Sequence, residues 1–472
     1  MRPTTQLSPV LFPTFTFAVF FLVVYGVHVL LRAQPTAWKY AMLAASAVFY
    51  GWWDERFLSL IAGSILFNWW AAKKVERATG RKRKRFIRLG VVANLALLGF
   101  FKYYGFFVES LTEAFGAEQP LPFIEVILPV GISFYTFQAI SYVVDVGRRD
   151  VRAVRLIDVG VFLSFFPQLV AGPIVRAKEF LPQLNRHRLD DEVDSFEAVW
   201  MIGRGLFKKV VIATYLGETV VDPVFAAPTE ATKLELLQAM YGYAIQIYAD
   251  FSGYTDIAIG IALLLGFRFP VNFDNPYRSL SIQDFWRRWH ITLSNWLRDY
   301  LYISLGGNRL GLLRTYRNLM LTMVLGGLWH GAAWTFVAWG AIHGTALVIE
   351  RLLGVGSPAG ERPMATVARW FITFHVVCVA WVLFRADSFE IATDFLGGLA
   401  TAPLGSGVEW WALVIVIGAL AMQMAPTDLL LTIRERGADT DPLVQGALLG
   451  IWISLIVALG PEGVAPFIYF QF

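Results

Sequence analysis

Residues 321–344 read LTMVLGGLWHGAAWTFVAWGAIHG, and this stretch decides how the chain folds. It holds two histidines, His330 and His343, and no Asp, Glu, Lys or Arg. A run this long and apolar is typical of a membrane-embedded segment, where an ionisable side chain is costly and points to function by default. Because imidazole exchanges protons near neutral pH, these histidines are the first candidates for chemistry.

The whole composition agrees with a membrane protein. Of 472 residues, 56% are hydrophobic and 16% are charged, and the mean hydropathy is +0.54. Soluble domains carry about a quarter charged residues. The sequence therefore predicts an all-α polytopic membrane protein whose residues 1–472 form one integral-membrane domain. The formal net charge of +4 says little, but the placement of basic residues predicts topology.

Basic residues crowd residues 73–88, which hold nine Lys and Arg against Glu76. This excess puts the loop in the cytoplasm and the N-terminus outside, and the first apolar run, residues 10–31, is a spanning helix rather than a signal peptide. A solvated loop and a surface for lipid headgroups are equally good interpretations of the basic run. The apolar runs predict about eleven crossings. The later runs are residues 41–53, 57–72, 89–101, 126–146, 198–221, 234–269, 321–344, 370–384, 411–424 and 444–459.

Three segments do not fit simple crossings. Residues 159–173 have basic residues on both sides, which favours a re-entrant or buried hairpin and implies a cavity open to the cytoplasm. Residues 234–269 are too long for one straight span and contain Asp250, Gly253 and Asp256, so we expect one broken or strongly tilted helix. Residues 285–302 are aromatic, basic and amphipathic, which predicts a segment lying in the membrane interface.

The six histidines are not equivalent. His28 and His375 stand alone among apolar residues and are expected to be structural, and His187 lies in a solvated loop. His330 is either a general base or a helix-packing residue, with the two interpretations equally supported. His343 follows thirteen residues later, which in an unbroken helix would place the rings on opposite faces about 20 Å apart. The two rings therefore cannot form one dyad unless the helix breaks between them.

His290 lies within a segment that mixes cations with aromatic rings. Such a mixture suits a phosphate-bearing, partly aromatic ligand, although an interfacial anchor uses the same residues. The candidate donor-binding residues are Trp286, Arg287, Arg288, Trp289, Asn295, Arg298 and Asp299.

Several other chemistries lack their sequence patterns. Cys378 is the single cysteine, which excludes an intrachain disulfide and a cysteine-based metal site. The chain contains no HExxH, no GxxxxGK[ST], no helix-opening GxGxxG and no GxSxG, so we expect no metal and no bound cofactor. Asp250 and Asp256 allow a cation or proton relay, as in a transporter, although their spacing around a glycine also fits capping of a helix break.

Six blocks of the sequence carry a resemblance to a known family. They resemble the membrane-bound O-acyltransferase (MBOAT) superfamily, and most closely its bacterial branch of alginate O-acetyltransferase membrane subunits, over residues 11–472. The blocks are WRRWHITLSNWLRDYLYISLGGNR (286–309), LGGLWHG (325–331), LPVGISFYTFQAISYVVDV (128–146), AGPI (171–174), DFSGYTDIAIG (250–260) and PFIYFQF (466–472).

The resemblance implies a fold of about eleven helices around a tunnel with a cytoplasmic funnel. It makes His330 the central catalytic histidine, His290 its upstream polar partner and His343 a further histidine typical of this branch. It implies acetyl-CoA as co-substrate, membrane lipids and periplasmic or membrane-anchored acetyltransferase proteins as partners, no nucleic acid, and a place in the bacterial inner membrane. The acetyl group would pass across the membrane for O-acetylation of a polysaccharide such as alginate, and whether this chain contacts the polysaccharide directly stays open.

The residues and the resemblance suggest one mechanism. His330 takes a proton from an acceptor hydroxyl as it attacks a thioester, and His290 orients it or stabilises the developing charge. Transfer through an acyl-histidine stays open. The alternatives are acyl transfer from a carrier protein, as in the similar D-alanyl transferase of teichoic acid assembly, a proton-coupled transporter, or an idle scaffold for a secreted transferase.

Overall fold

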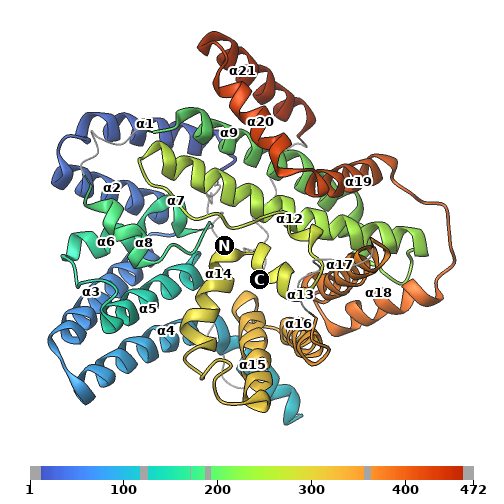
Figure 1. Cartoon of the computed structure of the whole chain (residues 1–472), viewed down its shortest axis with the longest axis horizontal. Coiled ribbons are helices and arrows are strands. Elements are labelled where there is room, and N and C mark those ends of the chain that lie inside the picture. Colours follow the sequence, from blue (N-terminus) through green and yellow to red (C-terminus); the bar gives the residue numbers. More distant parts are fainter. Residues whose placement is uncertain (1–11, 117–125, 171, 187–192, 356–362, 461–472) are drawn as a thin grey trace, which may run out of the picture. The chain divides into compact units, whose positions relative to one another are not determined.

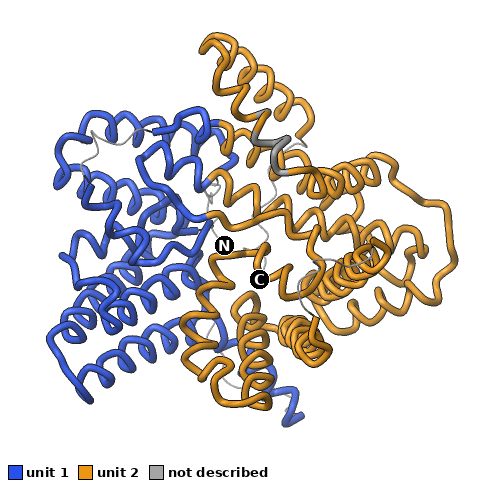
Figure 2. The backbone as a smooth tube through the Cα atoms, viewed as in Figure 1, with its two compact units in different colours: residues 1–199, 258–270 blue, residues 200–257, 271–472 orange. Residues whose placement is uncertain are grey.

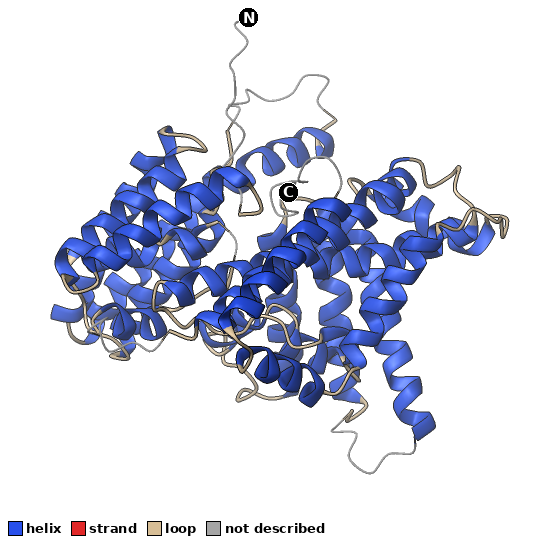
Figure 3. Cartoon of the chain, turned by 90° about the horizontal axis from the view of Figure 1, so that it is seen from above, coloured by secondary structure: helices blue, strands red, loops and turns tan. Residues whose placement is uncertain are grey.

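The structure is a computed structural model, and it describes residues 12–116, 126–170, 172–186, 193–355 and 363–460. All regular structure in these ranges is helical, and no strand occurs within them (Figure 3). The chain forms two compact units, which interleave along the sequence: residues 1–199 with 258–270, and residues 200–257 with 271–472 (Figure 2). The terminal PFIYFQF block and His187 lie outside the described residues.

The first unit is built on three helices that pack on one another, α3, α4 and α5 (Figure 1). Small residues allow this contact: a Cβ atom added to Gly90 of α4 would lie 2.8 Å from Cγ1 of Val143 in α5. The basic run, predicted to be a loop, is largely helical, because α3 continues to Arg77 and α4 begins at Gly80. The helices are α1 (Phe15–Leu31), α2 (Pro35–Gly51), α3 (Arg56–Arg77), α4 (Gly80–Ala114) and α5 (Ile132–Arg148).

Within residues 159–173, the described residues 159–170, 172 and 173 form a short, broken and largely buried segment rather than one full span. They belong to α6 (Leu156–Ser164), α7 (Phe166–Leu169) and the chain before α8 (Ala177–Leu184). Asp158 in α6 accepts a 2.6 Å hydrogen bond from Lys39, and both side chains are buried. Because a buried charge needs a partner, this pair ties the segment to α2.

The second unit begins with a helix that changes its winding. α9 (Ser195–Leu206) continues through the π-helix η1 (Phe207–Ala213), α10 (Thr214–Leu216), the π-helix η2 (Gly217–Val221) and α11 (Asp222–Ala226). π-Helical turns are rare and often accompany functional sites. α12 (Lys233–Leu264) lies mostly in this unit and ends in the other.

α12 corrects the expectation of a helix broken at its aspartates, because it is continuous across Asp250, Gly253 and Asp256. Gly253 serves helix packing instead: a Cβ atom on Gly205 of α9 would lie 2.6 Å from the carbonyl oxygen of Gly253. The two helices cross where neither has a side chain, which is the small-residue contact common in membrane helices.

Each of these aspartates has a cationic partner on the crossing helix. Asp250 pairs with Lys209, and both side chains are almost fully buried. Asp256 accepts from Arg204 at 2.6 Å and from Lys208 at 2.8 Å. Buried charges placed in this way are compensated, which favours a structural role over a free relay.

Among the residues that the structure describes, four helices are long and apolar enough to cross a membrane: α4, α12, α17 (Pro363–Arg385) and α21 (Pro442–Leu459). α1 and α19 (Trp410–Met424) are shorter apolar helices. Further helices are α18 (Phe389–Thr401) and α20 (Thr427–Ala438). The described residues thus make an all-helical membrane protein, and they do not establish the predicted number of crossings.

Candidate active site

The amphipathic segment expected at residues 285–302 is not one continuous interfacial helix. It consists of α13 (Ile282–Arg288), α14 (Ile291–Trp296) and the π-helix η4 (Leu297–Tyr302). The break falls at His290, whose φ of 42° and ψ of 54° place it in the left-handed region. This conformation is costly for a residue with a side chain and is found where the surroundings enforce it. His290 is fully buried, so the segment turns inward at this point.

The chain before α13 holds this break in place. The Oδ1 atom of Asn272 lies 3.2 Å from Nδ1 of His290 and accepts from the Thr292 backbone N–H at 3.1 Å. The Asn272 carbonyl oxygen accepts from the backbone N–H of Ile291 at 2.9 Å. Burial without a charged partner lowers the pKa of His290 to about 3, so its ring is neutral at pH 7.

His330 is the last residue of α15 (Leu312–His330), and α16 (Trp334–Leu352) packs against this helix after a short turn. The glycines make that contact possible: a Cβ atom on Gly327 would lie 2.2 Å from the Phe336 carbonyl oxygen, and one on Gly340 would lie 2.4 Å from that of Met323. The helix therefore breaks between the two histidines, which was the condition for bringing them near each other.

The break places both histidines beside one indole ring. The Trp339 ring centroid lies 5.2 Å from that of His330 and 4.9 Å from that of His343. The indole N–H of Trp286 donates to Nδ1 of His343 at 3.3 Å. His343 thus contacts α13 and Trp339. The histidine ring nearest to His330 comes from another part of the chain.

That neighbour is His290, with 6.4 Å between the two ring centroids. Aromatic rings surround the pair, and both side chains are buried. Such an apolar surrounding excludes water and strengthens electrostatic interactions within it. The rings in contact with one or both histidines are Phe251, Trp329, Trp339 and Phe384.

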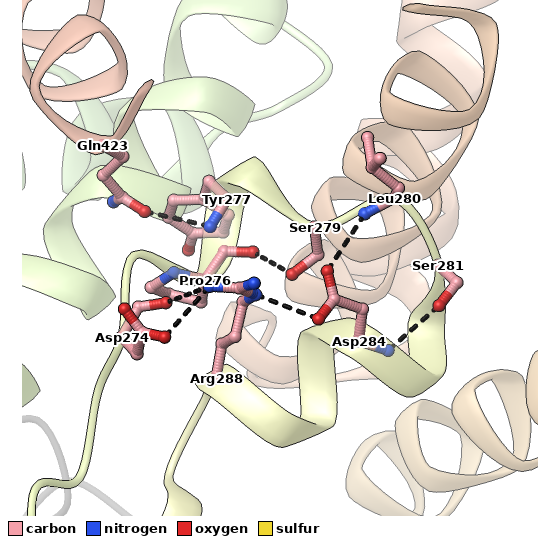
Figure 4. Close-up of polar contacts among 9 residues, drawn as sticks. All are labelled: Asp274, Pro276, Tyr277, Ser279, Leu280, Ser281, Asp284, Arg288 and Gln423. Atoms are coloured by element: carbon pink, nitrogen blue, oxygen red, sulfur yellow. Dashed lines mark hydrogen bonds and ion pairs between the residues drawn. The ribbon is translucent and has the colours of Figure 1, made fainter. Parts of the chain in front are cut away.

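α13 is anchored at both ends (Figure 4). Arg288 donates to Asp284 at 3.0 Å and to Asp274 at 3.0 Å, and Ser281 caps the first turn through the N–H of Asp284. Glu350 of α16 accepts from the backbone N–H groups of Ile282 and Gln283. These contacts satisfy backbone donors that a helix start leaves unpaired.

The predicted donor-binding residues fall into different surroundings. Arg288 is committed to its two aspartates, and Arg298 to Asp299 at 2.7 Å. Arg287 is exposed and makes no hydrogen bond or ion pair within the described part of the chain. Trp286 and Asn295 are half-buried and Trp289 is buried, so Arg287 is the cation of this group that a ligand can reach without breaking an ion pair.

Two histidines set aside as structural have the contacts of structural residues. Nδ1 of His28 accepts from the indole N–H of Trp38 at 3.0 Å. His375 lies 2.9 Å from the hydroxyl of Tyr241 and 2.8 Å from the Phe371 carbonyl oxygen. Asn272, by contrast, is a site residue that sequence reasoning missed, because no spacing rule joins it to His290 across an irregular chain.

Similar sequences occur in one known family of membrane enzymes. Residues 36–386, which include all three candidate histidines, match the model of the membrane-bound O-acyltransferase family, MBOAT. The chain is 43% identical to the probable alginate O-acetylase AlgI of Pseudomonas putida over 464 residues, which cover 91% of this chain and 94% of the relative.

Two relatives with other names are also similar. The peptidoglycan O-acetyltransferase of Helicobacter pylori is 38% identical over 77% of this chain and 73% of its own length. The teichoic acid D-alanyltransferase of Streptococcus thermophilus is 30% identical over 54% of this chain and 68% of its own length.

Proposed function

Because the chain belongs to the membrane-bound O-acyltransferase family and is an O-acyltransferase, we propose that it moves an acetyl group from cytoplasmic acetyl-CoA across the membrane. The acetyl group then serves the O-acetylation of a polysaccharide outside the cell, such as alginate. The observation that carries the proposal is the buried pair of His290 and His330 inside an aromatic enclosure. A thioester is protected from water in such a place while a base remains at hand.

In the proposed reaction His330 accepts the proton of an acceptor hydroxyl as the hydroxyl oxygen attacks the thioester carbonyl. A carbon–oxygen bond forms and the carbon–sulfur bond breaks. The proton held by His330 then passes to the departing thiolate, so that coenzyme A leaves as a thiol. General acid–base catalysis of this kind contributes about 10²–10⁴-fold to a rate.

Coenzyme A carries phosphates, which need a cation at the cytoplasmic entrance. Arg287 fits this role, because it is exposed and makes no ion pair within the described residues. Trp286 precedes it in the sequence; its half-buried ring contacts His343, and the part that stays accessible is the surface proposed for the adenine base. Arg288 and Arg298 support the proposal less, because each already binds a carboxylate.

The proposal extends to the surroundings of the chain. We place it in the bacterial inner membrane, with a tunnel formed by about eleven crossings, some through helices shorter than a full span. Membrane-anchored or periplasmic acetyltransferase proteins receive the acetyl group, and the polysaccharide meets this chain indirectly or not at all.

A second candidate is acyl transfer from a carrier protein to a cell-envelope polymer. The similarity to the D-alanyltransferase of Streptococcus thermophilus favours keeping it. A proton-coupled transporter is supported less, since Asp250 and Asp256 are both held in ion pairs.

The test uses purified protein in nanodiscs with acetyl-CoA labelled on the acetyl group, and follows the label to protein, lipid, water or an added glycan. Wild type should cleave the thioester, His330→Ala should not, and His375→Ala should cleave as wild type does. Cleavage that survives in His330→Ala would contradict the assigned role. No cleavage by wild type, with candidate partner proteins present, would leave the carrier-protein donor or the transporter.

A further inference from the structure

We infer that Asn272 is a positioning residue that fixes the neutral ring of His290 in one tautomer, with the proton on Nδ1 and the lone pair on Nε2. This inference rests on the proposed function for its catalytic meaning, while the tautomer itself follows from hydrogen bonds alone. Asn272 is buried, and it lies in the irregular chain that precedes α13.

The hydrogen-bond partners of the Asn272 side chain distinguish its amide oxygen from its amide nitrogen. Oδ1 accepts from the backbone N–H of Thr292 at 3.1 Å and from its hydroxyl at 2.8 Å. A backbone N–H can only donate, so the amide atom facing it must be the oxygen and not the nitrogen. The orientation of the Asn272 amide is therefore set by the main chain of α14.

The same oxygen lies 3.2 Å from Nδ1 of His290. An amide oxygen can only accept, so Nδ1 must carry the proton. In a neutral imidazole the other nitrogen is then bare. Nε2 of His290 is indeed buried, and it has no hydrogen-bond partner among the described residues, which leaves its lone pair for a group that enters the site.

Asn272 also holds the backbone in the conformation that this arrangement needs. The Asn272 carbonyl oxygen accepts from the N–H of Ile291 at 2.9 Å, directly after the left-handed His290. Asn272 thus makes two contacts: its carbonyl oxygen binds the main chain directly after His290, and its side chain binds the His290 ring. Strain of this kind persists only where several contacts oppose its relaxation.

The tautomer limits what His290 can do in acyl transfer. A bare Nε2 accepts a hydrogen bond and cannot donate one to a negatively charged oxygen. The ring beside it is His330, which becomes positively charged when it takes the hydroxyl proton. His290 therefore acts by stabilising that charge with its lone pair, and not as an oxyanion donor.

Histidine labelled with ¹⁵N in lipid bilayers gives a direct test, since the two tautomers have distinct nitrogen spectra. The signal absent from His290→Gln is that of His290, and in wild type it should show the proton on Nδ1. Asn272→Ala should lose this preference. Asn272→Asp, whose carboxylate oxygens accept the same bonds, should keep it. A wild-type spectrum with the proton on Nε2 overturns the inference without any variant.

Activity gives the second readout. Asn272→Ala should lower kcat at least tenfold with little change in the KM for acetyl-CoA. The carboxylate introduced by Asn272→Asp places a negative charge beside the ring and raises the pKa of His290. As the pH is lowered, this variant should lose half of its activity at a pH about one unit or more above that of wild type. Unchanged kcat in Asn272→Ala, or an unshifted acid limb in Asn272→Asp with the carboxylate ionised, contradicts the positioning role.

The two readouts separate the inference from the function on which it rests. If wild type cleaves no thioester but shows the Nδ1–H tautomer, the proposed reaction fails and the role of Asn272 in fixing the ring stands. If wild type cleaves acetyl-CoA and the tautomer is the other one, the reaction stands and the role of Asn272 fails. Folding of each variant is checked by gel filtration and thermal unfolding before either measurement.

Discussion

His290 and His330 lie with 6.4 Å between their ring centroids, although forty residues separate them in the sequence. Each ring sits at a helix boundary: His290 precedes α14 and His330 ends α15. Helix boundaries allow the backbone to turn, so two buried rings can meet there without widening the packing of either helix. The pair therefore forms where two helices begin and end, and not along the length of either.

The two histidines should behave as one unit. We expect His330→Gln to lower the rate of thioester cleavage by about 10²–10⁴-fold, the range for general acid–base catalysis, and His290→Gln to lower it by at least tenfold through loss of the stabilised charge. Because both act on the same proton transfer, the double variant should be little worse than the poorer single variant. Timed assays of labelled acetyl-CoA measure the cleavage rate of each variant. If the fold-loss of the double variant equals the product of the two single fold-losses, the histidines act independently.

The crossing of α9 and α12 should not tolerate a side chain. Gly205→Ala should destabilise the protein by about 1–3 kcal/mol, because the added Cβ atom meets a backbone carbonyl that cannot move alone. Thermal unfolding in detergent measures the shift. Gly418→Ala in α19 is the matched control, since nothing lies within 4 Å of its added Cβ atom. Equal shifts for both variants would argue against the close approach.

Lys209 and Asp250 should be needed as a pair. Lys209→Met or Asp250→Asn removes one member of a buried ion pair, and a broken buried ion pair costs about 3–5 kcal/mol. The double variant Lys209→Met with Asp250→Leu should recover much of the loss. Unfolding temperatures of the three variants decide this. Stable single variants that have lost only activity would instead revive a relay role for Asp250.

The neutral state of His290 should make stability depend on pH. Burial lowers its pKa from the ordinary value of 6.5 to about 3, so the unfolded chain binds a proton that the folded chain does not. This contribution to stability is fully present above pH 6.5 and is lost as the pH falls toward 3. Between about pH 7 and pH 5, His290→Gln should therefore lose less stability than wild type, as unfolding in nanodiscs would show. If the free energy of unfolding changed with pH equally in wild type and His290→Gln, the folded chain would protonate His290 as readily as the unfolded chain does.

The sequence predicted much of the architecture because membrane burial leaves a strong mark on composition. The helical class, the apolar segments and the short buried segment around Val159 all follow from hydropathy and basic flanks. The crossing of α9 and α12 could not be predicted from the sequence. Asp250 and Gly253 suggested a break in α12, because a single sequence does not show that lysines after α9 compensate the charges of the aspartates. Pairing across helices is a property of packing and not of local pattern.

The three histidines of the candidate site could be proposed from the sequence, whereas the residue that positions His290 could not. His290, His330 and His343 carry a chemical signal of their own, and the spacing of the last two requires a helix break if their rings are to lie close together. Asn272 gives no such signal, because asparagine is common in irregular chain and its partners lie eighteen or more residues away. The arginines of the same segment suggested an anion site from their number alone, whereas their aspartate partners appear only in the folded chain.

The position of His330 at the very end of α15 has a further consequence. The last turn of a helix carries a partial negative charge from carbonyl groups that have no helical partner, and a positive ring placed there is stabilised by about 0.3–2 kcal/mol. In the proposed reaction, the positive charge on His330 therefore arises in an electric field that the folded helix already provides. Under the proposed function, this field lowers the free energy of the transient imidazolium, and the fold rather than the substrate supplies that part of the stabilisation.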